Sequence, residues 1–190
     1  MVGILELDEK DKKILEILEK NPEVSQNEIA KIVGLSQPSV GSRIKKMKEL
    51  GIINHAYGIN IKNAGLYILK ADIKCRQPKE ILNLFNGCPF FLNGFVVAGN
   101  KNLSMFFVGE DLSSLEAIVD QHIRTNPNVY DVDVGIIVRA ENDTIIPMKI
   151  HVERSDKSPC NSDCGKCDYW DCELCLGCPV TGYYRGKIWK

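Results

Sequence analysis

The chain has 190 residues, with 24 basic and 25 acidic side chains and a formal net charge of −1. A chain of this length can bury a hydrophobic core without disulfides, and its bulk charge indicates no particular partner. The first residues, MVGILELDEKDKK, lack the features of a signal peptide, and no apolar run is long enough to span a bilayer, so we expect a cytoplasmic protein with no membrane partner.

Three short helices are predicted near the N-terminus. Residues 8–20 have apolar side chains at the three-and-four spacing of one helix face. Ser25 and Glu28 form a capping box before a second helix, which Gly34 can end in a left-handed conformation. Ser36 is the N-cap candidate of a third helix, so the sequence predicts a helix-turn-helix.

A hairpin is predicted directly after the third helix. In GIINHAYGINIK, residues 51–62, apolar side chains partly alternate around Gly58, namely Ile53, Tyr57, Ile59 and Ile61. Three helices followed by a hairpin are typical of a winged helix-turn-helix, which we assign to residues 1–62.

An α+β pattern follows, which we assign to a second domain at residues 63–154. Strands and helices are expected in the order βαββαβ, at residues 66–75, 78–87, 90–99, 103–110, 111–127 and 129–140. This is the order of a ferredoxin-like fold. Residues 144–153 could add a strand at a sheet edge, because Pro147 is unsuited to a central strand.

The third predicted helix carries a polar face opposite its apolar stripe. Small hydroxyls near its N-terminus would allow close approach to base edges, and lysines further along can neutralise phosphates. Residues 36–62 also hold a local excess of four positive charges. The alternative is an ordinary solvated face on a small helical domain. The predicted contacts with double-stranded DNA are Ser36, Gln37, Ser39, Ser42, Arg43, Lys45 and Lys46.

Several short motifs in residues 7–66 are similar to those of a known family. They are Leu7-Asp8, Ile14-Leu15, Gly34-Leu35-Ser36, Arg43 and Gly51-Ile52-Ile53. With them the segment resembles the DNA-binding domain of the Lrp/AsnC family of bacterial and archaeal transcription regulators. The resemblance implies a βαββαβ domain that senses ligands and forms dimers, which associate further and place their recognition helices in successive major grooves. It also implies control by an effector, often an amino acid. We therefore expect a homodimer or a larger even-numbered homo-oligomer.

One stretch departs from the family pattern. The family commonly has Gly-x-x-Asp between the second and third strands, whereas this chain has Gly99-Asn100-Lys101-Asn102, with an amide in place of the carboxylate. A neutral amide is a weaker partner than a carboxylate for the ammonium group of an amino acid. The predicted effector-binding residues are Gly99, Asn100 and Asn102, and the small-molecule effector itself stays open.

The last segment, residues 155–190, is rich in cysteine. Six cysteines with the spacing C-x3-C-x2-C-x4-C-x2-C-x2-C-P are candidate metal ligands, namely Cys160, Cys164, Cys167, Cys172, Cys175 and Cys178. Cysteines two residues apart can reach one metal from a tight turn. In a reducing compartment such a cluster indicates metal or redox chemistry rather than structural disulfides. We expect a small Cys-rich C-terminal module that binds metal.

The identity of the metal stays open. Four thiolates suit Zn²⁺, while C-x2-C-x2-C followed by proline resembles part of the run that binds a [4Fe-4S] cluster, and Cu(I) is a third candidate. Redox-active disulfides are the main alternative to a metal. Cys75 and Cys88 are expected to be small core side chains, and the histidines show no ligand spacing, although His151 lies nine residues before Cys160.

These features predict a sequence-specific DNA-binding transcription regulator that is controlled by the metal or redox state of its cysteine tail. One alternative is an effector-controlled regulator whose tail is a purely structural zinc clip. Another is an iron-sulfur enzyme, because Cys160, Cys164 and Cys167 match the spacing in radical S-adenosylmethionine enzymes. Those enzymes place the motif near the start of a large barrel, and here only 23 residues follow Cys167, so we do not expect an enzyme.

Overall fold

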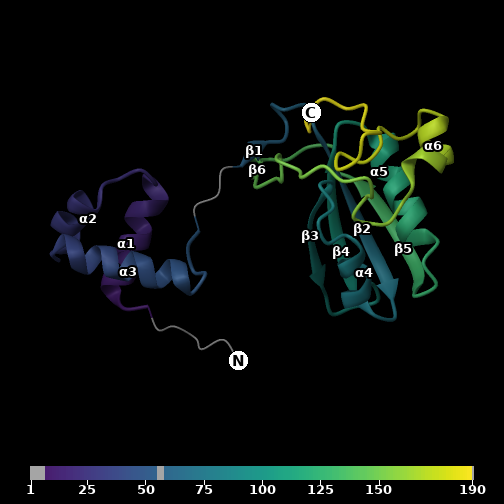
Figure 1. Cartoon of the computed structure of the whole chain (residues 1–190). Helices are drawn as coiled ribbons and strands as arrows, with labels where there is room; N and C mark the ends of the chain where they lie inside the picture. The colour runs from purple at the N-terminus through teal and green to yellow at the C-terminus, as the bar shows by residue number, and fades with distance from the viewer. Residues whose placement is uncertain (1–6, 55–57, 190) are drawn as a thin grey trace. The chain divides into compact units, whose positions relative to one another are not determined.

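Three helices make up the first of two compact units in the computed structural model, which describes residues 7–54 and 58–189. The chain divides between residues 56 and 57. The helices are α1 (Glu9–Lys20), α2 (Gln26–Val33) and α3 (Gln37–Glu49), shown in purple and blue in Figure 1. None of the helices in the described ranges is both long and apolar enough to cross a membrane.

The ends of these helices are fixed by the residues that the sequence predicts. Ser25 accepts a hydrogen bond from the backbone of Glu28 at 3.2 Å, and the Glu28 carboxylate accepts one from the backbone of Ser25 at 3.1 Å. Gly34 has φ 65° and ψ 46°, the left-handed conformation that ends α2. The three helices then bury one core, made of Ile14, Ile29, Ala30, Val33, Val40, Ile44 and Met47.

Gly41, in the middle of α3, allows α2 and α3 to approach closely. A Cβ atom at this position would lie 2.9 Å from the Gln26 side-chain oxygen. That oxygen accepts a hydrogen bond of 2.8 Å from the Gln37 amide. The absent side chain at Gly41 therefore makes room for a polar contact between the two helices.

The hairpin predicted after α3 is wrong in the residues that the structure describes. Strand β1 (Ile59–Asn60) pairs antiparallel with β6 (Ile145–Ile146). Gly58 lies against the β6 backbone, where a Cβ would be 3.1 Å from the Ile146 carbonyl carbon. Ile59 and Ile61 thus pack with Ile146 of a distant strand and not across a local turn. Residues 55–57, which include His55 and Tyr57 of the predicted hairpin, lie outside the described residues.

The second unit contains the expected βαββαβ order. Its elements are β2 (Tyr67–Cys75), α4 (Pro78–Leu84), β3 (Phe91–Val96), β4 (Leu103–Gly109), α5 (Leu112–Val119), the π-helix η1 (Asp120–Arg124) and β5 (Val129–Ile136). The strands form an antiparallel sheet in the order β3-β4-β2-β5. This is the strand order of a ferredoxin-like fold, so the predicted α+β class is confirmed.

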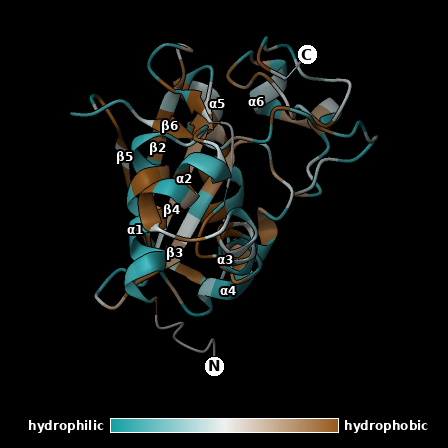
Figure 2. Ribbon diagram, turned by 90° about the vertical axis from the view of Figure 1, so that its left-hand side faces the viewer, coloured by the Kyte–Doolittle hydropathy of each residue, from teal (hydrophilic) through white to brown (hydrophobic). Residues whose placement is uncertain are grey.

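One face of this sheet and its two helices enclose the main core. Alternate residues of β2, such as Leu69 and Ile73, pack with Ile81 of α4 and Leu115 of α5. Figure 2 shows hydrophobic and hydrophilic stretches on the ribbons of these strands. Cys75 and Cys88 are both buried in this core, as the sequence predicts.

Two details of the second unit differ from the expected elements. The helix predicted at residues 111–127 is interrupted, because its second half is the π-helical turn η1. The strand predicted at residues 144–153 is reduced to the two residues of β6, which pair with β1 and do not extend the main sheet. Pro147, which cannot donate a backbone hydrogen bond, directly follows this short strand.

The cysteine tail folds back onto the second unit. It contains the 3-10 helix η2 (Cys164–Lys166) and the short helix α6 (Asp168–Asp171), and in Figure 1 it passes beside α5. Trp189 is 2% exposed, packs in the main core, and donates a 2.7 Å hydrogen bond to the Lys149 carbonyl. Because the tail shares this core, a separate Cys-rich module is not confirmed.

Candidate DNA-binding face and cysteine tail

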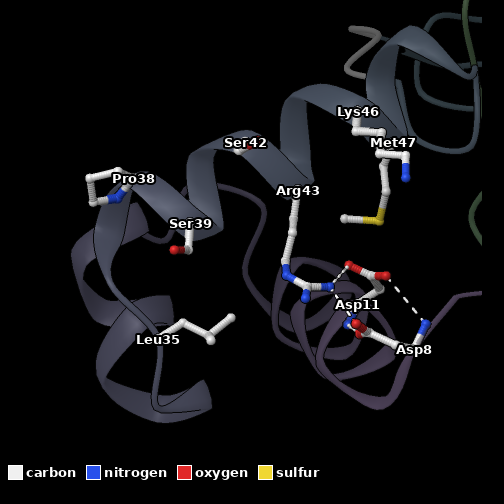
Figure 3. Close-up of a pocket in the computed structure, with 9 residues that line it drawn as sticks. All are labelled: Asp8, Asp11, Leu35, Pro38, Ser39, Ser42, Arg43, Lys46 and Met47. Atoms are coloured by element: carbon white, nitrogen blue, oxygen red, sulfur yellow. Dashed lines mark hydrogen bonds and ion pairs between the residues drawn. The ribbon is translucent and has the colours of Figure 1, made fainter.

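The polar face of α3 is open to solvent. Of the predicted DNA contacts, only Arg43 is half-buried, and the exposed ones are Ser36, Gln37, Ser39, Ser42, Lys45 and Lys46. Ser39, Ser42, Arg43 and Lys46 line one surface pocket together with residues at the start of α1 (Figure 3). The fold therefore brings hydroxyl and ammonium groups together on one side of α3.

Arg43 is bound within the protein. Its guanidinium donates hydrogen bonds of 2.7 Å to Asp8 and to Asp11, which Figure 3 shows as dashed lines. The backbone of Asp11 and the Arg43 guanidinium hold the pKa of the Asp8 carboxyl below its usual value. Arg43 thus connects α3 with the N-terminal end of α1, and this structural role is independent of any contact with DNA.

Other predicted DNA contacts also have partners within the protein. The Ser36 hydroxyl accepts a hydrogen bond from the Ser39 backbone at 3.3 Å, which caps α3. Gln37 donates its amide hydrogen bond to Gln26 of α2. Lys45 lies 3.8 Å from Glu49, and both side chains are exposed, so this pair contributes little to stability. Ser42, Lys45 and Lys46 are the groups best placed for an external partner.

The predicted effector residues lie in the turn between β3 and β4. Gly99 and Asn100 are exposed. The Asn102 side chain accepts a hydrogen bond of 2.9 Å from the Cys75 backbone N–H and donates one of 2.8 Å to the Cys75 carbonyl. This amide therefore joins the turn to the end of β2, and its role toward an effector stays a prediction.

The tail cysteines are all free thiols, but they differ in exposure. Cys164 is buried, Cys172 is exposed, and the half-buried ones are Cys160, Cys167, Cys175 and Cys178. In the described part of the chain, no three or more side chains of histidine, cysteine, aspartate or glutamate are already arranged to hold a metal ion. The donor chemistry of the segment, thiols with a nearby imidazole, nevertheless suits thiophilic ions such as Zn²⁺ and Cu(I).

The tail contacts one side of α5 and η1. The Gln121 amide donates a 2.7 Å hydrogen bond to the Cys167 sulfur, and the backbone N–H of Leu176 donates one of 2.7 Å to the Ser114 hydroxyl. The hydroxyl of Tyr169 in the tail donates to the Asp120 carboxylate. Contacts from the first turn of α5 and from η1 therefore hold the tail in place.

His122 in η1 is a functional candidate that sequence spacing does not reveal. Its Nε2 lies 3.1 Å from the Ser162 hydroxyl. Burial raises the pKa of the Cys160 thiol, but hydrogen bonding to His122 and Ser158 outweighs burial and lowers it to about 6. The imidazole thus lies next to this thiol. The two residues are 38 positions apart in the sequence, so no local motif could have indicated that they are neighbours.

Cys88 is a second residue that the sequence did not connect with the tail. Burial, with smaller contributions from the neighbouring thiols of Cys160 and Cys178, raises the pKa of its thiol to about 12. Burial likewise raises the pKa of Cys178 to about 12, with Cys160 and Cys164 adding to the effect. Cys88 is therefore a core side chain, as predicted, and also a neighbour of two tail cysteines.

Comparison with known proteins identifies the class of the first unit. The winged helix-turn-helix DNA-binding family matches residues 7–54. The HTH-type transcriptional regulator Ptr1 of Methanocaldococcus jannaschii is 32% identical over 142 residues, which cover 72% of this chain and 95% of that protein. The HTH-type transcriptional regulator FL11 of Pyrococcus furiosus is 28% identical over 165 residues, which cover 82% of this chain and 97% of that protein.

Solved structures agree with the fold. Escherichia coli AsnC has a TM-score of 0.62 at 20% identity, over 75% of this chain and 99% of that chain. The Mycobacterium tuberculosis leucine response regulatory protein LrpA has a TM-score of 0.63 at 22% identity, over 72% of this chain and 96% of that chain. The chain belongs to the Lrp/AsnC family of helix-turn-helix transcription regulators. It is a DNA-binding transcription regulator and not an enzyme.

Proposed function

We propose that this regulator binds specific sequences in double-stranded DNA with the exposed face of α3. The observation that carries the proposal is the position of Ser42, Lys45 and Lys46 on the second helix of the helix-turn-helix, all open to solvent. Ser39 and Ser42, near the helix N-terminus, would contact base edges, while Lys45 and Lys46 neutralise phosphates.

The proposed phosphate contacts of the two lysines are tested by the double substitution Lys45→Ala and Lys46→Ala. Two fewer phosphate contacts should weaken binding to every sequence and reduce the slope of log K against log salt concentration by roughly 2. A matched control is Lys12→Ala with Lys13→Ala, which removes the same charge from exposed positions on α1. If both double variants show the same slope as the wild type, α3 does not carry the phosphate contacts.

The base contacts are tested by Ser42→Ala. Because the Ser42 side chain caps no helix, its loss should change the sequence preference in selection from a random DNA pool and leave the salt slope unchanged. Ser39→Ala is less clean, since the Ser39 hydroxyl lies 2.8 Å from the Ser36 hydroxyl at the start of α3. An unaltered preference in the Ser42 variant contradicts its assignment to base readout.

We also propose that the metal or redox state of the cysteine tail controls DNA affinity. The support is that the tail packs along α5 and η1 and shares the core of the second unit. A change in the tail would therefore alter the packing of the second unit, which the family resemblance implies is the dimerising domain, and Lrp/AsnC regulators usually form oligomers. A differential free energy of about 1.4 kcal/mol between the two tail states would already change DNA affinity tenfold.

The test compares the affinity of metal-loaded, metal-stripped and oxidised protein for a selected operator. Truncation before the tail is unsuitable because it removes Trp189 from the core, so Cys→Ser variants of the tail serve instead. Equal affinity of all forms, within a factor of about two, would support the second candidate, a structural zinc clip. The burial of Trp189 favours that candidate, because it shows the tail acting as part of the fold.

A further inference from the structure

The cysteine tail is a loop whose two ends meet. The backbone N–H of Ser155 donates a 2.9 Å hydrogen bond to the Val180 carbonyl. The Arg154 guanidinium donates hydrogen bonds of 3.1 Å to the carbonyls of Pro179 and Thr181. All six tail cysteines lie between these two ends of the loop. We call the three hydrogen bonds that close the loop the loop base.

The same guanidinium also holds the C-terminal end of the chain. Its Nη2 donates a 3.3 Å hydrogen bond to the Trp189 carbonyl. Arginine has several N–H donors in a rigid planar fork, so one side chain can hold several carbonyls at fixed positions. Pro179, one of its acceptors in the loop base, directly follows Cys178, the last cysteine of the tail. Arg154 therefore connects the end of the cysteine run with Trp189 through a single side chain.

The segment that ends at Trp189 has a second anchor in the second unit. The Trp189 ring packs edge-on against Phe90 in the main core. Just before it, the Glu110 carboxylate accepts hydrogen bonds from the backbone N–H groups of Lys187 at 2.8 Å and Ile188 at 3.1 Å. The C-terminal segment is thus held from one side by Glu110 and from the other by the guanidinium at the loop base.

We propose that Arg154 couples the loop base to Trp189, so that the closed loop and the buried C-terminal segment open and close as one unit. A shift of the loop base moves the carbonyls that orient the guanidinium. The guanidinium then keeps its hydrogen bond to Trp189 only if the C-terminal segment moves with it. This inference rests on the proposed control by the tail and names the residue that would carry a change at the cysteines into the core.

The experiment disturbs one end of this connection and observes the other, by amide hydrogen exchange in the reduced, metal-free, full-length protein. The disturbance is Gly186→Ala, because a Cβ at this position would overlap the Glu110 carboxylate and so loosen the C-terminal segment. The readout is the backbone amide of Ser155 in the loop base, followed by NMR. Its exchange should become roughly tenfold faster, as expected when an opening breaks one fewer hydrogen bond to a charged group.

The role of Arg154 is tested by repeating the measurement in the Arg154→Lys background. Lysine keeps the charge, but its ammonium lacks the planar fork that spans the carbonyls. In this background Gly186→Ala should no longer change the exchange of Ser155. The matched control background is Arg139→Ala, which removes an exposed guanidinium that pairs with Glu141. There the roughly tenfold response should persist.

Two results overturn the inference. One is an unchanged Ser155 amide while residues 187–188 exchange faster, and the other is a response that persists in the Arg154→Lys background. Should Gly186→Ala not fold, or not loosen residues 187–188, Glu110→Gln disturbs the same segment, because a neutral amide is a weaker acceptor than a carboxylate. The operator affinities of the tail states test the proposed control separately. Equal affinities contradict that control, and the exchange of Ser155 still decides whether Arg154 couples the two ends.

Discussion

At the scale of single residues, Arg43 has hydrogen-bond partners that the sequence did not predict. The sequence predicted it as a DNA contact, yet its guanidinium binds two carboxylates at the start of α1. Asp11, 32 positions earlier in the chain, has a side chain that is only 13% exposed. The spacing of residues along one helix indicates on which face a side chain lies. It does not indicate which charged residue from another part of the chain that side chain contacts.

Replacing Arg43 with Ala should therefore destabilise the first unit. The loss of two charge-assisted hydrogen bonds, one of them to a mostly buried carboxylate, should cost about 1 kcal/mol after allowance for solvent exposure. Urea unfolding followed by circular dichroism measures it. Lys45→Ala, which removes only the exposed 3.8 Å pair with Glu49, should leave the unfolding midpoint unchanged. A loss of equal size in both variants would contradict the role of Arg43 as a tie between helices.

Tyr184 gives a prediction for alkaline pH. Burial and the hydrogen bond to the Glu110 carboxylate raise the pKa of its phenol above the ordinary value. The folded protein holds this phenol neutral, while the unfolded chain ionises it near pH 10. Its stabilising contribution is therefore complete below about pH 10 and falls as the pH rises beyond that. The difference in unfolding temperature between wild type and Tyr184→Phe should shrink from pH 9 to pH 11, and a constant difference would refute this.

At the scale of elements, local signals predicted helix ends well and strand partners poorly. The cap formed by Ser25 and Glu28 and the left-handed Gly34 involve residues within a few positions of each other, so the sequence contains all the information needed. The partner of β1 is Ile145–Ile146, with paired residues 85 and 87 positions apart, too far for a hairpin pattern to predict. Apolar periodicity also did not distinguish the π-helical turn η1 from the continuous helix predicted there.

Gly34 carries a prediction for the connection between α2 and α3. Its φ of 65° is unfavourable for a residue with a Cβ, so Gly34→Ala should destabilise the first unit by about 1 kcal/mol or slightly more. Gly34→Asn should cost less, because asparagine tolerates the left-handed conformation. The two variants are compared by urea unfolding. Equal losses would mean that contacts of the turn, rather than its backbone conformation, set the stability.

At the scale of the whole molecule, the sequence identified the regulator and its two folds but not the residues that join the tail to them. The winged helix-turn-helix and the βαββαβ order follow from local patterns and family motifs. The association of Cys88 and His122 with tail thiols arises only when α4, η1 and the tail pack together. Neither residue lies in a recognisable ligand motif. The sequence alone therefore assigned Cys88 to the core and gave His122 no role.

The assembly of the chain is the prediction that belongs to this scale. Lrp/AsnC regulators usually form oligomers, and the second unit exposes several large apolar side chains, namely Phe95, Val96, Tyr130, Ile136 and Val138. Burying such side chains favours association. We expect a homodimer or a larger even-numbered species in sedimentation at micromolar concentration, shifted toward smaller species by Phe95→Glu. A wild-type protein that sediments only as a monomer would refute this.

The burial of Trp189 has a consequence for how the protein is made. This side chain, the last but one in the chain, packs against Phe90 with 5.2 Å between ring centroids. During synthesis the core of the second unit therefore stays incomplete until residue 189 has emerged from the ribosome. In the described residues, the core of the first unit is built from its own helices and the residues beside them, so these helices can fold while the rest is still being translated. A stop codon introduced before residue 189 would leave a DNA-binding unit attached to a second unit with an open core.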